Sequence, residues 1–341
     1  MSGAHRHDLL LYDDGDQLAA ALGAVLGREA GDDDLVVLAC RERHEEALAE
    51  VSDGPRAPLS LPRPVVRLRP VVALAAQRRL AREHAVAGGR VWYVAEPDHG
   101  GTPDERYEAV RYEAACSLSL ARVPLSTVCA YPRRDTPEPL LDLLLRTHPR
   151  LLTPRGPVDN PAFRDPAGVV AALHRPVHRP VPAVRPVFRE SAVVALSDVA
   201  AVRARLAAAL RPLPTLVRTD FVAAVNEVLA NACVHGVPPV EVAVWVTPTR
   251  VECRVTDRGA GFVDPLAGFS VEPDDVRTRA GLWLARQACD ELDGWPSGGR
   301  FTVRLATGVG PERALQTHGA LARAETARAR VAHAHRFRGG R

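Results

Sequence analysis

The chain has 341 residues, of which 46% are hydrophobic and 25% are charged, and its formal net charge is +3. This length and hydrophobic content predict two folded domains, whereas so small a net charge predicts no strong attraction to nucleic acid or to an anionic membrane. All 44 basic residues are arginines, which excludes a phosphate-binding loop built around a lysine and any lysine Schiff-base chemistry.

Short apolar runs alternate with longer amphipathic segments from residue 8 to residue 147. The runs predict strands at 8–12, 35–39, 64–68, 90–95 and 124–131, and the segments between them predict helices near 16–29, 42–51, 73–87, 104–121 and 137–147. Runs such as LVVLA and VWYVA are apolar throughout, as expected for strands buried on both faces. Residues 1–150 are therefore predicted to form an α/β domain with a parallel sheet covered by helices.

Three stretches of this region, HDLLLYDD, RYEAACSLSLARVPLSTVCAYPRRD and LLLRTHPRLL, resemble the MEDS sensory domains. The resemblance implies a recombinase-like fold without a phosphate loop, which senses an unknown small molecule such as a hydrocarbon derivative. Cys116 and Pro132 stand where that family often has asparagine and aspartate. The resemblance is carried by residues at recurring positions of the family: His7, Tyr12, Tyr112, Glu113, Cys129, Tyr131, His148 and Pro149.

Taken one by one, three of these residues also have ordinary structural interpretations. Tyr112 is typical of a core aromatic with Glu113 as its solvated neighbour. His148, directly before Pro149, is typical of a histidine that contacts the last carbonyls of a helix.

Six cysteines stand singly, without a C-x-x-C pair, at positions 40, 116, 129, 233, 253 and 289. Their scatter through apolar runs predicts reduced core thiols, and the 12 histidines show no ligand spacing with them, which argues against a zinc site. No signal segment is visible at the start and no uncharged apolar stretch of about 18 residues occurs. We therefore expect a soluble, cytoplasmic protein without a membrane span.

Eight prolines between residues 150 and 186 predict an interdomain linker at 151–186, because a regular helix does not tolerate such a density. The segment AGVVAALHR within it is the stretch that predicts a short helix. The second domain is predicted at 187–307 and opens with a strand near 191–196 and an amphipathic helix at 198–213.

The stretch NEVLANACVHG, residues 226–236, predicts a helix with one polar stripe. At about 100° per residue, Glu227, Asn231 and His235 lie one above the next. A magnesium ion prefers oxygen ligands, so the Asn231 carboxamide is a candidate ligand, and Glu227 is a candidate base toward a water or hydroxyl that attacks a terminal phosphate. A helix with one solvated face is the plainer interpretation. The opposite face is apolar: Phe221, Val225, Val228, Leu229 and Ala232.

Alternation in VECRVTDRGAGF, residues 251–262, predicts a strand that carries Asp257 inward at its end. A buried carboxylate needs a hydrogen-bond donor, and an adenine amino group is one. Gly259 and Gly261 allow a tight turn beside a flat base. The same sequence is also typical of an ordinary D-x-G turn without a ligand. Alternating valines at 240–246 and apolar residues at 301, 303 and 305 predict further strands of a mainly antiparallel sheet.

The stretch VRTRAGLWLARQACDEL, residues 276–292, predicts a helix that opens at Gly281 and runs to Leu292, with Leu282 in its first turn. Arg277 and Arg279 lie just upstream. Free amides at a helix start, with arginines beside them, suit a phosphate, although a solvated basic loop before a core helix fits as well.

In this order the three stretches resemble the N, G1 and G2 boxes of the Bergerat-fold (GHKL, histidine kinase-like) ATPases, and most closely the anti-sigma regulatory factors, which are protein serine kinases. The resemblance implies an α/β sandwich that binds ATP with Mg²⁺. It also implies an anti-anti-sigma antagonist and a sigma factor as partners, and hence control of transcription. The roles it assigns are Glu227 as base, Asn231 as Mg²⁺ ligand, Asp257 as adenine contact, Gly259 and Gly261 as the base-side turn, Arg277 as lid arginine, and Gly281 with Leu282 as the phosphate-side helix start.

Other functions remain open at this point. Arg279 stands where the family often has glycine, which favours a nucleotide-binding switch without catalysis. A histidine kinase would need a phosphoacceptor histidine on a dimerisation helix, and no such helix is visible. A nucleic-acid regulator is disfavoured by an aromatic content of 5%. Residues 308–341, rich in alanine and arginine, predict a frayed helix or tail, with a basic binding arm as the alternative.

Overall fold

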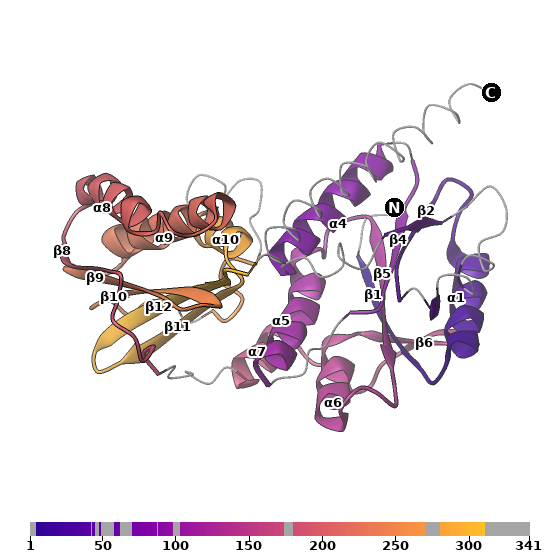
Figure 1. The fold of residues 1–341 in the computed structure, drawn as a ribbon. Coiled ribbons are helices and arrows are strands. Elements are labelled where there is room, and N and C mark those ends of the chain that lie inside the picture. The colour runs from indigo at the N-terminus through magenta and orange to yellow at the C-terminus, as the bar shows by residue number, and fades with distance from the viewer. Residues whose placement is uncertain are drawn as a thin grey trace, which may run out of the picture. The chain divides into compact units, whose positions relative to one another are not determined.

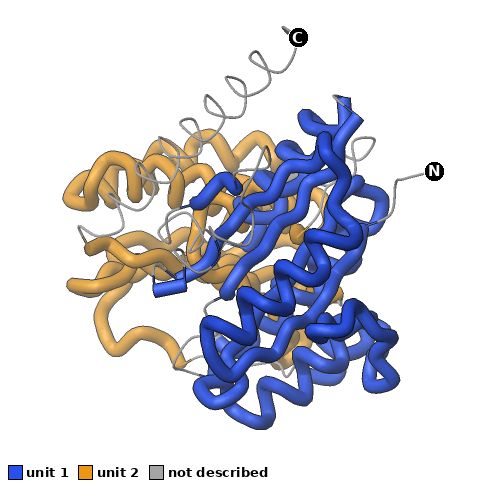
Figure 2. The backbone as a smooth tube through the Cα atoms, turned by 90° about the vertical axis from the view of Figure 1, so that its right-hand side faces the viewer, with its two compact units in different colours: residues 1–173, 319–341 blue, residues 174–318 orange. Residues whose placement is uncertain are grey.

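The computed structural model describes residues 5–41, 43–44, 48, 58–61, 70–86, 88–97, 103–173, 180–262, 264–269 and 280–310. They divide into two compact units, separated in the chain between residues 173 and 174 (Figures 1 and 2). The expected strand at 64–68, most of the expected helix at 42–51, the arginines at 277 and 279 and the tail from 311 lie outside the described residues.

The described strands of unit 1 form one seven-stranded sheet in the order β3-β2-β4-β5-β1-β6-β7. Neighbouring strands are parallel throughout, except that the edge strand β7 is antiparallel to β6. Their bounds are β1 Arg6–Tyr12, β2 Leu35–Ala39, β3 Leu59–Ser60, β4 Val91–Ala95, β5 Leu125–Pro132, β6 Arg150–Thr153 and β7 Gly156–Asp159.

Helices cover both faces of this sheet, which confirms the predicted α/β architecture (Figure 1). On one face, Leu18 and Leu22 of the first helix pack against β1, β2 and β4. On the other face, Val110 and Leu144 from two later helices pack against Leu9 of β1 and the end of β5. The described helices of the unit are α1 Gly15–Glu29, α4 Pro70–Ala85, α5 Pro103–Ser119, α6 Glu138–Thr147 and α7 Pro166–Leu173.

The prediction of an extended linker from residue 151 is wrong for residues 151–173, which belong to unit 1. β6 pairs with β1, β7 pairs with β6, and α7 follows. The prolines fit these elements because Pro157 lies in the edge strand and Pro166 is the first residue of α7, two positions where a missing backbone N–H is tolerated. Residues 180–187 are neither helix nor strand.

The described strands of unit 2 form a five-stranded antiparallel sheet in the order β11-β12-β10-β9-β8, with three helices on one face (Figure 1). This confirms the predicted α/β sandwich. The elements are β8 Phe188–Val193, α8 Leu196–Ala209, α9 Thr215–His235, β9 Val240–Val246, β10 Arg250–Asp257, α10 Ala280–Ala288, β11 Glu291–Ser297 and β12 Arg300–Gly308.

Two predicted boundaries in unit 2 are wrong. The first strand ends at Val193 because the Asp198 side chain accepts hydrogen bonds from the next two backbone amides and starts α8 at Leu196. The last predicted helix ends at Ala288, and Leu292 lies in β11, opposite Leu305 of β12. Leu292 is buried in this strand as well as it would be in a further helical turn. The strand also pairs the backbone N–H and C=O groups of this segment with those of β12.

The sheet face away from the helices carries a buried ion network. Arg304, 4% exposed, donates to Glu252 and Glu291 at 2.9 Å each and to Asp293 at 3.3 Å. Arg254 donates to Glu252 as well, at 3.0 Å. Each buried charge therefore has an opposite charge beside it, which offsets the cost of removing it from water. No described helix is long and apolar enough to cross a membrane.

Candidate functional site

The helix α9 places the predicted polar stripe at the edge of the unit 2 core. Phe221, Val225 and Leu229 are at most 1% exposed, whereas Glu227 and Asn231 are partly exposed and His235 is exposed. The helix ends at His235, and the amide of Gly236 donates back to Ala232 O. The 3.6-residue spacing therefore separates a buried face from a polar face, as the sequence predicts.

Asp257 ends β10 and is 5% exposed, as the alternation of the strand predicts. Its Oδ1 accepts hydrogen bonds from the amides of Val237 at 3.2 Å and Gly259 at 2.5 Å. Both bonds from described residues go to Oδ1, so Oδ2 remains as an acceptor for another donor. The strand end and the end of α9 are thereby joined through one carboxylate.

Glycines allow the close approach between the end of α9, the end of β10 and the turn that follows β10. A Cβ at Gly236 would lie 2.6 Å from Asp257 Cγ, and one at Gly259 would lie 2.8 Å from Asp257 Oδ1. Gly261 has φ +68° and its Cβ would lie 2.2 Å from the Phe301 ring. Glycine is therefore required at all three positions by space, and at Gly261 also by backbone conformation.

The start of α10 lies against the polar stripe of α9. A Cβ at Gly281 would lie 2.9 Å from Asn231 Nδ2 and 3.0 Å from Asn231 Oδ1. Beside it, a Cβ at Gly268 would lie 2.8 Å from the carbonyl carbon of Leu282, and Arg286 Nε donates to Ala267 O at 2.8 Å. The start of α10 thus lies next to a carboxamide side chain, and the first amides of a helix have no acceptor within that helix.

The fold therefore brings the predicted residues together in two groups. Asn231 meets Gly281 at one place, with Glu227 one helical turn away from Asn231 and Leu282 next to Gly281 in the chain. Asp257 and Gly259 meet the end of α9 at another, and Gly261 follows. Arg277 lies outside the described residues.

Sequence reasoning missed Gly236 and Phe301 as parts of this site. Gly236 was visible as a glycine directly after a predicted helix, which is a common position for a helix end. Phe301 had no such signal, since its contact with Gly261 depends on β12 pairing with β10.

The helix α9 also carries one thiol, Cys233. Burial raises the pKa of the Cys233 thiol, and the charges of Asp198 and Asp257 raise it further. Because the thiolate is the nucleophilic form, a raised pKa makes this thiol a weaker nucleophile at neutral pH.

The residues fit a magnesium nucleotide. Asn231 offers a neutral oxygen that is partly exposed, and the glycine at position 281 leaves room beside that oxygen. Asp257 offers a buried acceptor for an exocyclic amino group, in a place where the glycine backbone allows a flat ring to approach.

Comparison with known proteins gives separate matches for the two units. No curated protein matches the chain. The solved structure of the RsbU and RsbW domains of Rv1364c from Mycobacterium tuberculosis is 21% identical, with a TM-score of 0.27, and the match covers 35% of this chain and 31% of that one. The chain therefore spans less than a third of the length of that structure.

Two family models match. Residues 6–149 match the MEDS model, described as the methanogen/methylotroph DcmR sensory domain, and residues 192–307 match the model of the histidine kinase-like ATPase domain. The second match includes the α9 stripe, Asp257 and the start of α10. The chain thus joins a MEDS sensory domain to a histidine kinase-like ATPase domain.

Proposed function

We propose that the ATPase domain binds Mg-ATP and acts as a protein serine/threonine kinase of the anti-sigma factor type. The observation that carries this proposal is the contact between Gly281 and Asn231, which puts helix-start amides beside a carboxamide oxygen. Amides at a helix start attract phosphate, and a carboxamide oxygen suits Mg²⁺. The family match of residues 192–307 supports a nucleotide as the ligand.

Asp257 selects the base in this proposal. Its Oδ1 is held by two backbone amides, so the carboxylate is oriented before the ligand arrives. Oδ2 accepts a hydrogen bond from the adenine amino group, whereas a guanine carbonyl at that place would be repelled. The nucleotide should therefore be ATP rather than GTP.

Asn231 holds the metal ion, and the backbone at Gly281 and Leu282 carries the amides for the phosphates. When bound, ATP supplies the phosphoryl group that is transferred. Glu227, one turn before Asn231 on the same stripe, accepts the proton of the attacking serine or threonine hydroxyl. Its carboxylate is partly exposed, so a partner's side chain can approach it.

The partners follow from the resemblance of the three boxes to anti-sigma factors. The phosphorylated protein is an anti-anti-sigma antagonist, and the regulated protein is a sigma factor, which places the activity in the cytoplasm. The MEDS domain senses a small molecule and controls this exchange. The supporting sequence is NEVLANACVHG with DRGAGF, in that order.

Two measurements on the full chain test the proposal. The first is calorimetric titration with a non-hydrolysable ATP analogue and Mg²⁺, and the second is transfer of labelled phosphate from ATP to an antagonist-type protein. Glu227→Ala should retain binding and lose transfer by at least about 10²-fold, because only proton removal is affected. Asn231→Ala should lose Mg²⁺-dependent binding.

His235→Ala is the matched control, because His235 lies on the same polar stripe of α9 but is exposed and is one turn past Asn231, which contacts Gly281 of α10. It should retain both activities. Absence of any saturable heat with a folded protein would refute the nucleotide site. A Glu227→Ala protein that loses binding and transfer to the same degree would refute the role of Glu227 as base.

A second candidate is a nucleotide-dependent switch that binds its partner without catalysis. Arg279 favours it, because this residue replaces a glycine that is common in the family and would stiffen the segment before α10. In that case the wild-type protein binds Mg-ATP and the partner, and labelled phosphate does not appear on the partner.

A further inference from the structure

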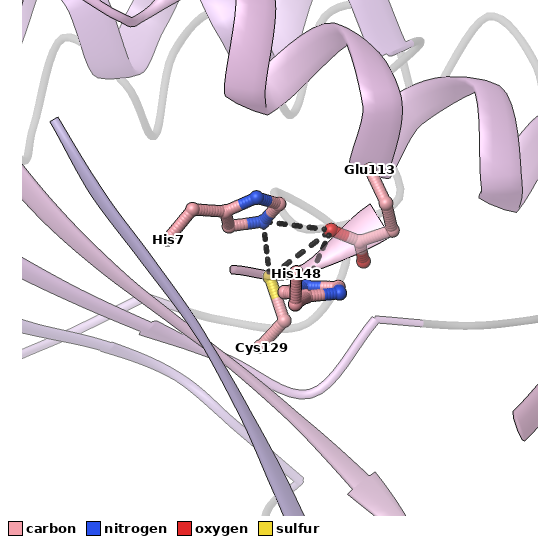
Figure 3. Close-up of side chains that lie close together, drawn as sticks. All are labelled: His7, Glu113, Cys129 and His148. Carbon is pink, nitrogen blue, oxygen red and sulfur yellow. Dashed lines mark hydrogen bonds and ion pairs between the residues drawn. The ribbon is translucent and has the colours of Figure 1, made fainter. Parts of the chain in front are cut away.

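Four buried side chains with metal-binding atoms converge in the MEDS domain (Figure 3). His7 lies on β1, Cys129 on β5, Glu113 on α5, and His148 directly follows α6. Each is at most 2% exposed, and their ligand atoms all lie within 4.8 Å of one another. The cluster lies between the sheet and the helices that cover this face.

The hydrogen bonds around the cluster fix which nitrogen of each histidine faces inward. His148 Nδ1 lies 2.8 Å from the carbonyl oxygen of Leu144, which can only accept, so Nδ1 carries the hydrogen. His7 Nδ1 lies 2.8 Å from Ser117 Oγ, and that hydroxyl already donates to Thr147 O. In the neutral form, both rings therefore direct a bare Nε2 lone pair into the cluster.

The centre of the cluster consequently has too many acceptors. Glu113 Oε2 lies 3.1 Å from His7 Nε2 and 3.4 Å from His148 Nε2. Cys129 supplies a single weak S–H donor among them. His148 Nε2 is buried and has no hydrogen-bond partner among the described residues. A buried acceptor without a partner is costly, and a cation at the centre would serve all four groups.

We propose that His7, Glu113, Cys129 and His148 bind one divalent metal ion of the zinc class. Two imidazoles, a thiolate and a carboxylate are ligands that Zn²⁺ prefers. One thiolate and one carboxylate also balance a charge of +2, so the loaded site is neutral. A neutral site costs far less to bury than an unbalanced charge.

The separations of the ligand atoms fit a tetrahedral ion. Bonds of about 2.0–2.3 Å place tetrahedral ligand atoms about 3.3–3.8 Å apart. Cys129 Sγ lies 3.4 Å from His7 Nε2 and 3.2 Å from Glu113 Oε2, and the two distances from Glu113 to the histidines are 3.1 and 3.4 Å. These four pairs therefore need to widen by only a few tenths of an ångström, and all the ligand atoms lie within 4.8 Å of one another.

The residues around the cluster hold the four ligands in the orientation that a metal requires. Tyr131 donates its hydroxyl to Glu113 Oε1 at 2.5 Å, which leaves Oε2 directed inward. The Leu144 carbonyl contacts Nδ1 of His148, and the Ser117 hydroxyl contacts Nδ1 of His7, which leaves Nε2 of each ring directed inward. Such outer hydrogen bonds normally accompany metal ligands. Because all four positions are protein side chains, the ion ties β1, β5 and α5 to the end of α6.

The experiment uses the full chain, stripped with a chelator and titrated with ZnCl₂ or CoCl₂. Uptake of one equivalent per chain is expected, together with the near-ultraviolet charge-transfer band that a thiolate gives with Co²⁺. Cys129→Ala should weaken binding at least about 100-fold and abolish the band. Cys40→Ala is the matched control, since Cys40 is a buried thiol on the opposite face of the same sheet, and it should change neither.

A third measurement does not depend on the variants. In the wild-type protein, the chelator should lower the melting temperature and stoichiometric zinc should restore it. A folded wild-type protein that takes up no metal would overturn the proposal. So would uptake without the cobalt band, which would indicate histidines elsewhere, or a Cys129→Ala protein with unchanged affinity. None of these measurements contains a nucleotide, so their outcome is independent of the proposed kinase activity.

Discussion

Gly281 at the start of α10 lies directly against the carboxamide of Asn231 on α9, with no room for a methyl group between them. The obstructing atoms are the end of a polar side chain and not backbone. A methyl group at residue 281 should therefore displace the Asn231 carboxamide while the fold persists.

Gly281→Ala should weaken Mg-ATP binding at least about tenfold, or about 1.4 kcal/mol, without lowering the melting temperature. Alanine also favours the helix, which supports unchanged stability. Gly27→Ala in α1 is the control, because a Cβ there meets nothing within 4 Å. Calorimetric titration of both variants measures the effect, and equal affinities for them would contradict the prediction.

Asp257→Asn should separate the structural and recognition roles of this carboxylate. A carboxamide oxygen can still accept from Val237 and Gly259, so stability should change little. Its NH₂ group would face the adenine amino group, and ATP affinity should fall about 10- to 100-fold. Asp264→Asn, at an exposed carboxylate that accepts from Leu266, should bind ATP normally.

Gly261→Ala should lower the free energy of unfolding of the ATPase domain more than Gly298→Ala does. Both glycines have positive φ, at +68° and +58°, so both variants incur a backbone penalty of about 1–2 kcal/mol. A Cβ at Gly261 also overlaps the buried Phe301 ring, whereas at Gly298 it meets nothing. Overpacking should add about 1–3 kcal/mol. Urea denaturation gives the two free energies of unfolding, and similar losses would exclude the ring contact as the cause.

Glu291 should make the stability of the ATPase domain depend on acid pH. Burial raises the pKa of Glu291, but hydrogen bonds and charges from Arg250 and then Arg304 outweigh it, and the pKa lies below its ordinary value of 4.5. The folded state therefore binds the proton more weakly than the unfolded state. The stabilisation is present above the ordinary pKa and is lost as the pH falls through the lower folded value.

The free energy of unfolding should thus differ between the wild type and Glu291→Gln at neutral pH, and the difference should shrink in acid. Glu241→Gln is the control, because Glu241 is a half-exposed carboxylate paired with Arg300. Its effect on the free energy of unfolding should be small, because exposed ion pairs contribute little. A difference for Glu291→Gln that stays constant down to the acid range would contradict the prediction.

The spacing of apolar and polar residues along the sequence predicted much of the ATPase domain's secondary structure. The 3.6-residue period of α9 separates Glu227 and Asn231 from Leu229, and the two-residue period of β10 turns Asp257 inward, because these periods are properties of the backbone itself. The same reasoning predicted the parallel sheet of unit 1 from its apolar runs. It misplaced Leu292, because an apolar residue at helical spacing is buried equally well in a strand, and only the pairing with β12 decides between them.

The sequence by itself determined two α/β units, the polar stripe and the inward carboxylate, since each depends on neighbours within about one turn or one strand. Only the tertiary structure brings His7, Glu113, Cys129 and His148 together. From the sequence, Glu113 is expected to be a solvated neighbour of Tyr112, and His148 to be a histidine at a helix end. His148 does contact Leu144 O, yet its other nitrogen faces Glu113, which is fully buried. No ligand spacing can show this, because the four residues come from four elements that only the packing of helices on the sheet brings together.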